Sequence, residues 1–398
     1  MSVVATISSP QPNGATIVEE MNRDSAGSGS SNAQQQDEER KHASKLGLPA
    51  NYHFEIDKTI KRIKEKKATR VALQFPEGLL MFSAPIADLL EEETGAEMVI
   101  LGDVTYGACC VDDYAATALG CDFLVHYGHS CLISIKDCTL PNMMYVFVEI
   151  DIDVTHFVDT VKSLVPSHTK VCCIATIQFV SSLRGAVGLL QQHFSHPIHV
   201  PQNRPLSSGE LLGCTSPKVD AALGIETVLY IGDGRFHLES FMIHNPAIQA
   251  LQYNPYEKKL TKEGYAHQEM HTLRQSAIAD AKAAGSVGIV MGTLGRQGNP
   301  KLVDRLTALA EQQGKSVVTF LMSEIFPAKL AAIPDVDAFI QVACPRLSID
   351  WGYAFDRPLL NPYEAEVALG STTWQSTYPM DHYSKSGGKW AVYTDKSL

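Results

Sequence analysis

Three cysteines lie in loops whose composition sets them apart from the other cysteines of the chain. Cys109, Cys214 and Cys344 each have glycine or proline and small polar residues as neighbours, and more than 100 residues separate each from the next. Functional residues concentrate in loops of this kind. Three thiolates brought together by the fold would bind a soft metal or an iron–sulfur cluster. The alternative for each cysteine is a buried structural role.

The remaining cysteines and the N-terminal sequence indicate the cellular compartment of the protein. The chain has nine cysteines, and Cys172 and Cys173 stand in an apolar run that is predicted to be a buried strand. The N-terminus lacks the basic and apolar segments of a secretory signal, and no apolar run reaches membrane-spanning length. We therefore expect a cytoplasmic protein, without membrane contact, whose cysteines are thiols or ligands instead of disulfides.

Size and charge narrow the class of protein. With 398 residues, 45% of them hydrophobic and 19% charged, the chain has the composition of a globular protein of two or three domains. The net charge of −11 disfavours nonspecific or direct binding to nucleic acid. It favours a small substrate or a basic protein partner.

The elements that must position the cysteine loops are predicted from an alternation of short apolar segments with helical patterns. Strands are predicted at residues 70–75, 97–102, 123–127, 170–177, 198–200, 227–231, 287–291, 316–321 and 338–342. Helices are predicted at residues 83–90, 115–118, 180–193, 302–313 and from Glu324 onward. This pattern indicates parallel sheets covered by helices on both faces, which bind ligands beyond the carboxyl ends of their strands.

The same pattern divides the chain into three similar Rossmann-like α/β modules, expected around a pseudo-threefold axis so that their cysteine loops meet. The N-terminal segment is rich in Ser, Gln and charge and is expected to be a disordered tail. The C-terminal extension would either dock against the body or lie over a partner. The expected boundaries are 1–44 for the tail, 45–145, 146–256 and 257–375 for the modules, and 376–398 for the extension.

Several separate motifs together resemble the diphthamide synthesis family. The resemblance extends from about residue 50 to residue 385. Its breadth makes it more specific than any single short motif. The motifs are Gln74–Leu79, Gly102–Cys109, His126–Cys131, Leu212–Pro217, Ile231–His237, Gly292–Gly298 and Ala343–Asp350.

The resemblance implies a catalytic subunit of an atypical radical S-adenosylmethionine enzyme. Its body would have three domains, arranged as in quinolinate synthase, with one cysteine per domain holding a [4Fe–4S] cluster. The matching positions here are Cys109, Cys214 and Cys344, while Cys110 competes for the first of these roles. A cluster with three protein thiolates leaves one iron open to bind the sulfonium cofactor.

The resemblance also implies the reaction and the partners. A 3-amino-3-carboxypropyl group would pass from S-adenosylmethionine to a histidine of translation elongation factor 2, in the first step of diphthamide biosynthesis. The expected partners are a paralogous second subunit in a heterodimer, elongation factor 2 as the protein substrate, and a small metalloprotein as the electron donor. No catalytic residue is assigned beyond the cluster.

The cofactor carries a carboxylate, for which arginine is the preferred bidentate partner. Arg235, Arg296 and Arg346 are the candidates, and fastening loops to neighbouring carboxylates is the structural alternative for each. Gly232 and Gly295 would let backbone amides approach the ligand. Further candidates for cofactor contact are Glu77, Gly78 and Asp233.

Two other functions remain open at this point. One is a subunit that carries a cluster or zinc without performing the chemistry. The other is a dehydratase similar to quinolinate synthase, in which the open iron acts as a Lewis acid on a small substrate.

Overall fold

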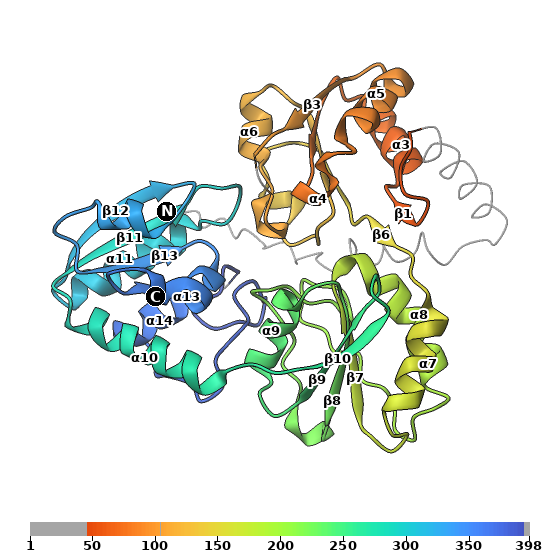
Figure 1. The fold of residues 1–398 in the computed structure, drawn as a ribbon. Helices are drawn as coiled ribbons and strands as arrows, with labels where there is room; N and C mark the ends of the chain where they lie inside the picture. Colours follow the sequence, from red (N-terminus) through yellow and green to blue (C-terminus); the bar gives the residue numbers. More distant parts are fainter. Residues whose placement is uncertain (1–45, 104, 394–398) are drawn as a thin grey trace, which may run out of the picture.

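The computed structural model describes residues 46–103 and 105–393, so the predicted N-terminal tail lies outside the described residues. Figure 1 shows three α/β bodies that meet at the centre of the molecule. Each contains one four-stranded sheet. The expected α/β class with three modules built on parallel sheets is confirmed.

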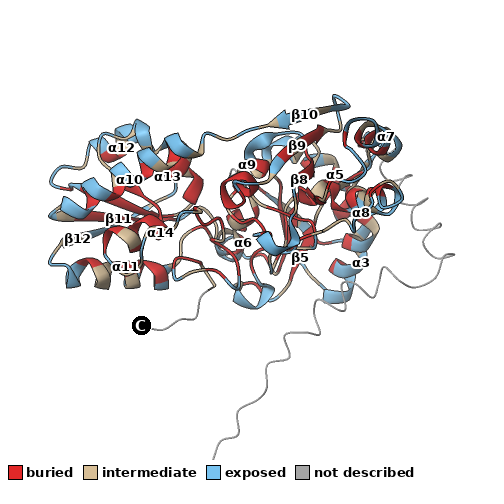
Figure 2. Cartoon of the chain, turned by 90° about the horizontal axis from the view of Figure 1, so that it is seen from below, coloured by how far each residue is buried: buried red, intermediate tan, exposed pale blue. Residues whose placement is uncertain are grey.

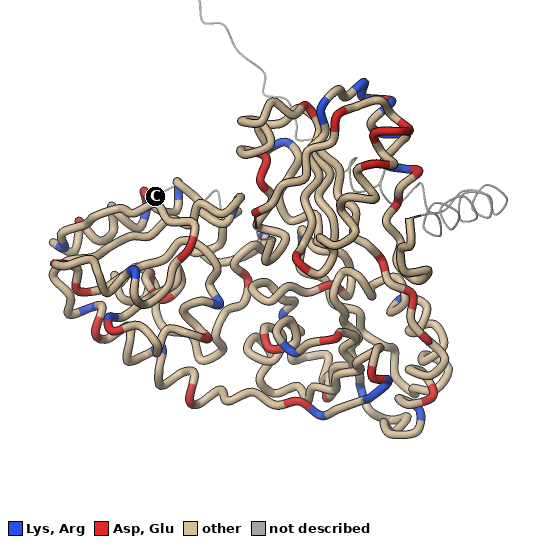
Figure 3. Tube along the Cα trace, turned by 45° about the horizontal axis from the view of Figure 1, so that its top comes forward, with Lys and Arg blue, Asp and Glu red and all other residues tan. Residues whose placement is uncertain are grey.

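The first body has a fully parallel sheet of strand order β3-β2-β4-β5. Its strands are β2 (Arg70–Gln74), β3 (Glu97–Leu101), β4 (Phe123–Tyr127) and β5 (Met143–Val146), and its helices are α3 (Ile56–Lys66), α4 (Glu77–Leu80), α5 (Ser83–Thr94), η1 (Ala108–Cys110), α6 (Asp113–Ala118) and η2 (Ile135–Asp137). In Figure 3 basic and acidic residues alternate on the outer helices of this body, where Lys64 of α3 pairs with Glu93 of α5.

The second body has the strand order β10-β9-β8-β7. Its strands are β7 (Val171–Ala175), β8 (Thr227–Ile231), β9 (Gln249–Asn254) and the antiparallel β10 (Lys259–Glu263), and its helices are α7 (Val154–Leu164), η3 (Ile177–Phe179), α8 (Val180–Leu190), η4 (Ala221–Leu223) and α9 (Arg235–His244). Cys172 and Cys173 are buried in β7, as predicted. The predicted strand at 198–200 is reduced to a single parallel bridge between His199 and Cys172.

The third body has the strand order β12-β11-β13-β14 and is parallel throughout. Its strands are β11 (Ser286–Gly292), β12 (Ser316–Met322), β13 (Ala338–Val342) and β14 (Leu359–Leu360), and its helices are α10 (His267–Ala283), α11 (Pro300–Gln312), α12 (Pro327–Ala331), α13 (Pro345–Trp351), η5 (Gly352–Ala354) and α14 (Pro362–Ala368). A separate two-stranded pairing of β1 (Tyr52–His53) with β6 (Glu149–Ile150) links the first two bodies.

The three sheets share one strand order. In the first and third bodies, the second strand along the chain lies on one side of the first strand, and the third and fourth lie on the other. The second body follows the same order once the His199 bridge is counted as its second strand, because His199 pairs with Cys172 of β7 while β8 and β9 follow on the opposite side. Each sheet therefore has a topological switch point beside its first strand, where α/β sheets bind ligands.

Figure 2 shows that the central strands of the sheets are buried, while the edge strands β10 and β12 and the outer faces of the helices are largely exposed. Each body has its own buried apolar core between sheet and helices. A further core joins residues of the first body to Leu206 of the second and to Tyr383 near the C-terminus. The C-terminal segment therefore docks against the body, which is one of the two alternatives expected from the sequence. In the residues that the structure describes, no helix is long and apolar enough to cross a membrane.

Candidate metal centre

Loops at the carboxyl ends of the strands touch one another at the centre of the molecule. The first and third bodies meet where the backbone N–H of Arg296 donates to the Cys109 carbonyl at 2.8 Å. The second and third meet where Arg346 Nη1 donates to the Gly213 carbonyl at 3.2 Å. These contacts place the three predicted cysteine loops in one region.

The three predicted thiols affect one another electrostatically. A hydrogen bond with Cys110, burial, and repulsion from Cys110, Cys214 and Cys344 raise the pKa of Cys109 well above its usual value. Burial, followed by the charge of Cys344, raises the pKa of Cys214 to about 12. Burial also raises the pKa of Cys344, against an opposing hydrogen bond from the Arg346 backbone. Three thiolates at this place need positive charge for compensation, and a metal cluster supplies it.

Cys110 faces a different set of partners. Its side chain is buried and accepts a hydrogen bond from Gln297 Nε2 at 3.4 Å, while its carbonyl accepts one from Gln74 Nε2 at 2.8 Å. The hydrogen bond with Cys109 lowers the pKa of Cys110 to about 7, against the effect of burial. Cys110 also contributes to the raised pKa of Cys344, so it belongs to the same region.

A buried tyrosine from the C-terminal segment packs in the same apolar cluster as Cys109 and Cys214. Tyr383 is 1% exposed, and among the described residues its hydroxyl has no hydrogen-bond partner. After burial, the groups that raise the pKa of Tyr383 are Cys109, Cys214 and Cys344. A buried hydroxyl without a partner costs free energy, so a group with sulfur acceptors between the thiols would satisfy it.

Within the described residues, no three His, Cys, Asp or Glu side chains are close enough together to hold a single metal ion. An iron–sulfur cube binds its cysteines at separate corners and therefore holds their sulfurs farther apart than one ion does. Thiols within electrostatic reach of one another, beside an unpartnered hydroxyl, have the donor chemistry that such a cluster requires.

Arg346, a predicted cofactor residue, fastens two bodies together. Its Nε donates to Asp350 at 2.9 Å and its Nη2 to Glu239 at 2.5 Å, while Nη1 donates to the carbonyls of Gly213 and Phe236. The guanidinium also lies 4.2 Å from the centre of the Phe236 ring. These are the contacts that the structural alternative for this arginine predicts.

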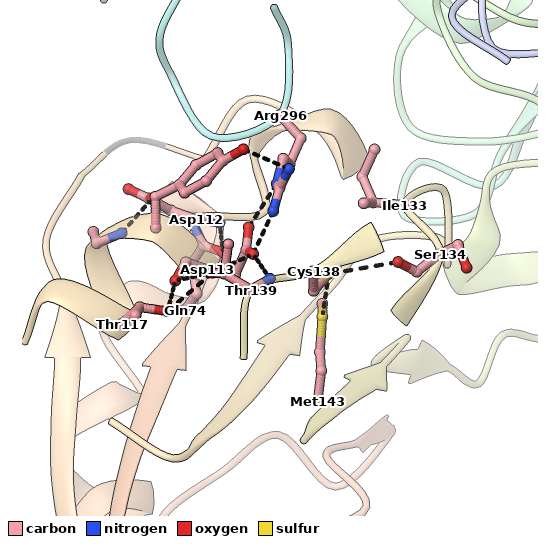
Figure 4. Close-up of polar contacts among 12 residues, drawn as sticks. Gln74, Asp112, Asp113, Thr117, Ile133, Ser134, Cys138, Thr139, Met143 and Arg296 are labelled. Atoms are coloured by element: carbon pink, nitrogen blue, oxygen red, sulfur yellow. Dashed lines mark hydrogen bonds and ion pairs between the residues drawn. The ribbon is translucent and has the colours of Figure 1, made fainter. Parts of the chain in front are cut away.

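Arg296 reaches from the loop after β11 to α6 of the first body, as Figure 4 shows. Its Nε and Nη2 donate to the two carboxylate oxygens of Asp113 at 2.7 and 2.5 Å, and Nη1 donates to the Tyr114 hydroxyl at 2.7 Å. Burial raises the pKa of Asp113, but hydrogen bonds from Arg296 and Thr139 outweigh it and lower that pKa. The bidentate pair holds the Cys109 loop against the third body.

Arg235 begins α9 and is the most exposed of the three arginines. Its side chain is 51% exposed, compared with 17% for Arg296 and 3% for Arg346. It pairs with Glu239 at 2.9 Å and with Glu263 at 3.2 Å.

The remaining predicted cofactor residues lie at strand ends in two of the bodies and in the loop after β11. Glu77 and Gly78 are exposed at the start of α4, after β2. Asp233 is exposed and follows β8, and the carbonyl of the preceding Gly232 accepts a hydrogen bond from Gln252 at 3.1 Å. Gly295 has φ +55°, and a Cβ there would lie 2.5 Å from the Cys110 carbonyl carbon, so only glycine fits.

Two histidines, His129 and His237, lie near the site. Burial and repulsion from His237 lower the pKa of His129 to about 4, and burial lowers the pKa of His237 to about 4. Among the described residues, His129 Nδ1 and the neighbouring His126 Nε2 have no hydrogen-bond partner. The end of β4 with the loop after it, and the start of α9, thus bring these imidazoles into one region.

Tyr383 and Thr215 were also missed by sequence reasoning. Thr215 Oγ1 lies 3.7 Å from Cys214 Sγ, and it accepts a hydrogen bond from the backbone N–H of Tyr383 at 3.0 Å. The position of Thr215 next to Cys214 was the only signal in the sequence, and nothing nearby marks Tyr383.

Comparison with known proteins gives consistent results. The model of the family described as "Putative diphthamide synthesis protein" matches residues 75–379. The chain is 56% identical over 353 residues to the 2-(3-amino-3-carboxypropyl)histidine synthase subunit 1 of Dictyostelium discoideum, covering 87% of this chain and 74% of that protein. It is 54% identical to the subunit 1 of Homo sapiens over 347 residues, covering 87% of this chain and 78% of that protein.

Among solved structures, Dph2 from Pyrococcus horikoshii, whose crystal structure contains a 4Fe-4S cluster, superposes with a TM-score of 0.69. The two sequences are 27% identical, and the match covers 84% of this chain and 95% of Dph2. The chain belongs to the diphthamide synthesis protein family and is a transferase subunit of diphthamide biosynthesis.

Proposed function

We propose that this chain is the catalytic subunit of a radical S-adenosylmethionine enzyme that holds a [4Fe–4S] cluster through Cys109, Cys214 and Cys344. The observation that carries the proposal is the meeting of the three cysteine loops, one from each body, through the Arg296–Cys109 and Arg346–Gly213 contacts. The buried Tyr383, whose hydroxyl has no partner among the described residues, packs with Cys109 and Cys214 at this place. The cluster named for Dph2 of Pyrococcus horikoshii supports it. The substrate in this account is a histidine of translation elongation factor 2.

Held by Cys109, Cys214 and Cys344, the cluster would supply an iron open to S-adenosylmethionine and one electron for cleavage of its Cγ–S bond, which yields methylthioadenosine and the 3-amino-3-carboxypropyl group. The residues of the chain have supporting roles. The three thiolates leave one corner of the cluster without a protein ligand. Tyr383 is buried and shields the side of the site on which it lies from solvent.

The cofactor carboxylate needs a cation that can exchange its present partner. Arg346 and Arg296 each hold buried or half-buried carboxylates that join two bodies, so releasing either would open the centre. Arg235 is half-exposed, so its ion pairs contribute little free energy, and its partner Glu239 keeps Arg346 as a second cation. We assign the carboxylate contact to Arg235, with Glu77, Gly78, Gly232, Asp233 and Gly295 at the neighbouring strand ends.

The partners in this proposal are a paralogous second subunit and a small metalloprotein that reduces the cluster. The test combines the anaerobically reconstituted pair of subunits with dithionite, S-adenosylmethionine and elongation factor 2. We expect methylthioadenosine, together with elongation factor 2 whose mass has increased by one 3-amino-3-carboxypropyl group. Formation of 5′-deoxyadenosine would contradict the proposed bond cleavage, and wild-type protein that contains only zinc would support a structural subunit instead.

A further inference from the structure

The C-terminal strap, residues 378–393, crosses all three bodies at the metal centre. It bonds to the second body where Ser216 N–H donates to the Met380 carbonyl at 2.8 Å. It bonds to the third where Asn299 Nδ2 donates to the Val392 carbonyl at 3.2 Å, and to the first where the Tyr393 hydroxyl donates to the Leu132 carbonyl. The strap is therefore hydrogen-bonded to all three bodies around the site.

The strap is also held rigidly by its own contacts. Trp390 Nε1 donates to Asp381 Oδ1 at 2.6 Å, and the Val392 N–H donates to the His382 carbonyl at 2.8 Å. Tyr383 packs in the apolar core shared by the first and second bodies. A side chain placed by so many contacts is pre-organised for a single position.

The backbone of Tyr383 is linked to one of the thiols through Thr215. Its backbone N–H donates to Thr215 Oγ1, which in turn lies in donating position to Cys214 Sγ. Its ring packs in the same cluster as Cys109 and Cys214, and its hydroxyl has no hydrogen-bond partner among the described residues. A phenol is protonated at neutral pH and can donate a hydrogen bond.

We propose that Tyr383 is a positioning residue whose hydroxyl donates a hydrogen bond to a sulfur of the cluster on the Cys109 side, and that the strap exists to hold it there. The inference rests on the proposed function, because it requires the cluster. A hydrogen bond to cluster sulfur stabilises the reduced form, which carries one more negative charge, and so raises the reduction potential.

The test is a redox titration of the full-length chain with its partner subunit, reconstituted with iron and sulfide. Tyr383→Phe removes only the hydroxyl, and we expect wild-type iron and sulfide content. The reduction equilibrium should shift about tenfold toward the oxidised form, a potential change of ~59 mV to more negative values for one electron. Tyr393→Phe, which removes the strap hydroxyl that donates to the Leu132 carbonyl, is the matched control and should leave the potential unchanged.

An unchanged potential in Tyr383→Phe, or an equal shift in Tyr393→Phe, would overturn the proposal. If Tyr383→Phe retains too little cluster for titration, pulsed electron paramagnetic resonance of the reduced wild type in D2O replaces the titration. A strongly coupled exchangeable deuteron is expected there, and its absence would also overturn the proposal. Wild-type protein without iron and sulfide would instead contradict the proposed function, so the two failures are distinguishable.

Discussion

At the scale of single residues, the central arginines differ in the exposure of their side chains and in how deeply their ion pairs are buried. Arg346 uses every guanidinium nitrogen on partners within the protein, while Arg235 keeps half of its side chain in solvent. Breaking a buried ion pair strands a charge, whereas breaking a surface pair does not. The two arginines should therefore respond differently to the same substitution.

We expect Arg346→Gln to lower the free energy of unfolding by about 3 kcal/mol, because Glu239 and Asp350 lose their buried partner. Arg235→Gln should cost less than about 1 kcal/mol. Urea denaturation of both variants measures this difference. Equal destabilisation by the two substitutions would show that Arg346 does not join the second and third bodies as described.

Arg235→Gln should weaken the binding of S-adenosylmethionine about tenfold, a loss of ~1.4 kcal/mol, because the cofactor carboxylate loses its cation. Calorimetric titration of the reconstituted protein measures the Kd. Lys262→Gln, on the neighbouring strand β10, serves as a surface-charge control. Wild-type affinity in Arg235→Gln would remove this residue from the site.

The buried histidines predict a pH dependence of stability. His129 and His237 have folded pKa values of about 4, below the ordinary value of 6.5, so the unfolded chain binds more protons between these values. Their stabilising contribution is complete above about pH 6.5 and is lost as the pH falls toward 4, at most on the order of 3 kcal/mol for each histidine.

Urea denaturation between pH 4 and pH 7 tests this expectation. His237→Gln should make the dependence on pH shallower, whereas His168→Gln, in an exposed turn, should leave it unchanged. An identical slope in wild type and His237→Gln would show that His237 is not neutral in the folded protein.

At the scale of elements, the strands that carry strong β-branched and apolar runs were predictable. Residues 227–231 and 338–342 form strands with the predicted bounds. The strand expected at 198–200 forms only a bridge, since Pro197 and Pro201 beside it cannot donate to a ladder. The helix expected from Glu324 begins at Pro327, because proline suits the first helical position.

Helix α10 was missed although it has 17 residues. Its buried positions include Arg274, whose guanidinium pairs with the buried Glu364 at 2.7 Å. A charged residue on the inward face interrupts the apolar periodicity by which a helix is recognised in a sequence. The buried charge of Arg274 is tolerated because it is paired with Glu364, which lies 90 residues further along the chain.

The loop after β11 depends on one glycine for its approach to the Cys109 loop. Gly295→Ala would place a methyl group 2.5 Å from the Cys110 carbonyl carbon in a left-handed conformation. We expect a loss of about 2 kcal/mol in unfolding free energy together with reduced iron content. Gly102→Ala, which meets open space, is the control, and equal effects of the two substitutions would contradict this account.

At the scale of the whole molecule, the shared strand order explains how cysteines far apart in the chain reach one centre. The three sheets share one topology, and the loops at the carboxyl ends of their strands converge. Arg296 and Arg346 hold these loops together. The composition of the cysteine loops predicted that these loops meet, and the cluster that they would hold stays a prediction. Docking of the C-terminal segment was one of the two alternatives expected from the sequence, but the place of Tyr383 could not be predicted, because it depends on packing across bodies that no local pattern encodes.

The most direct test of the central claim is the iron and sulfide content of anaerobically reconstituted cysteine variants. The wild type should bind about four of each per chain. Cys109→Ser, Cys214→Ser and Cys344→Ser should each lose the cluster, while Cys110→Ser and the control Cys121→Ser keep it. A full complement of iron and sulfide in any of the first three variants would contradict the proposal that one thiolate from each body holds the cluster.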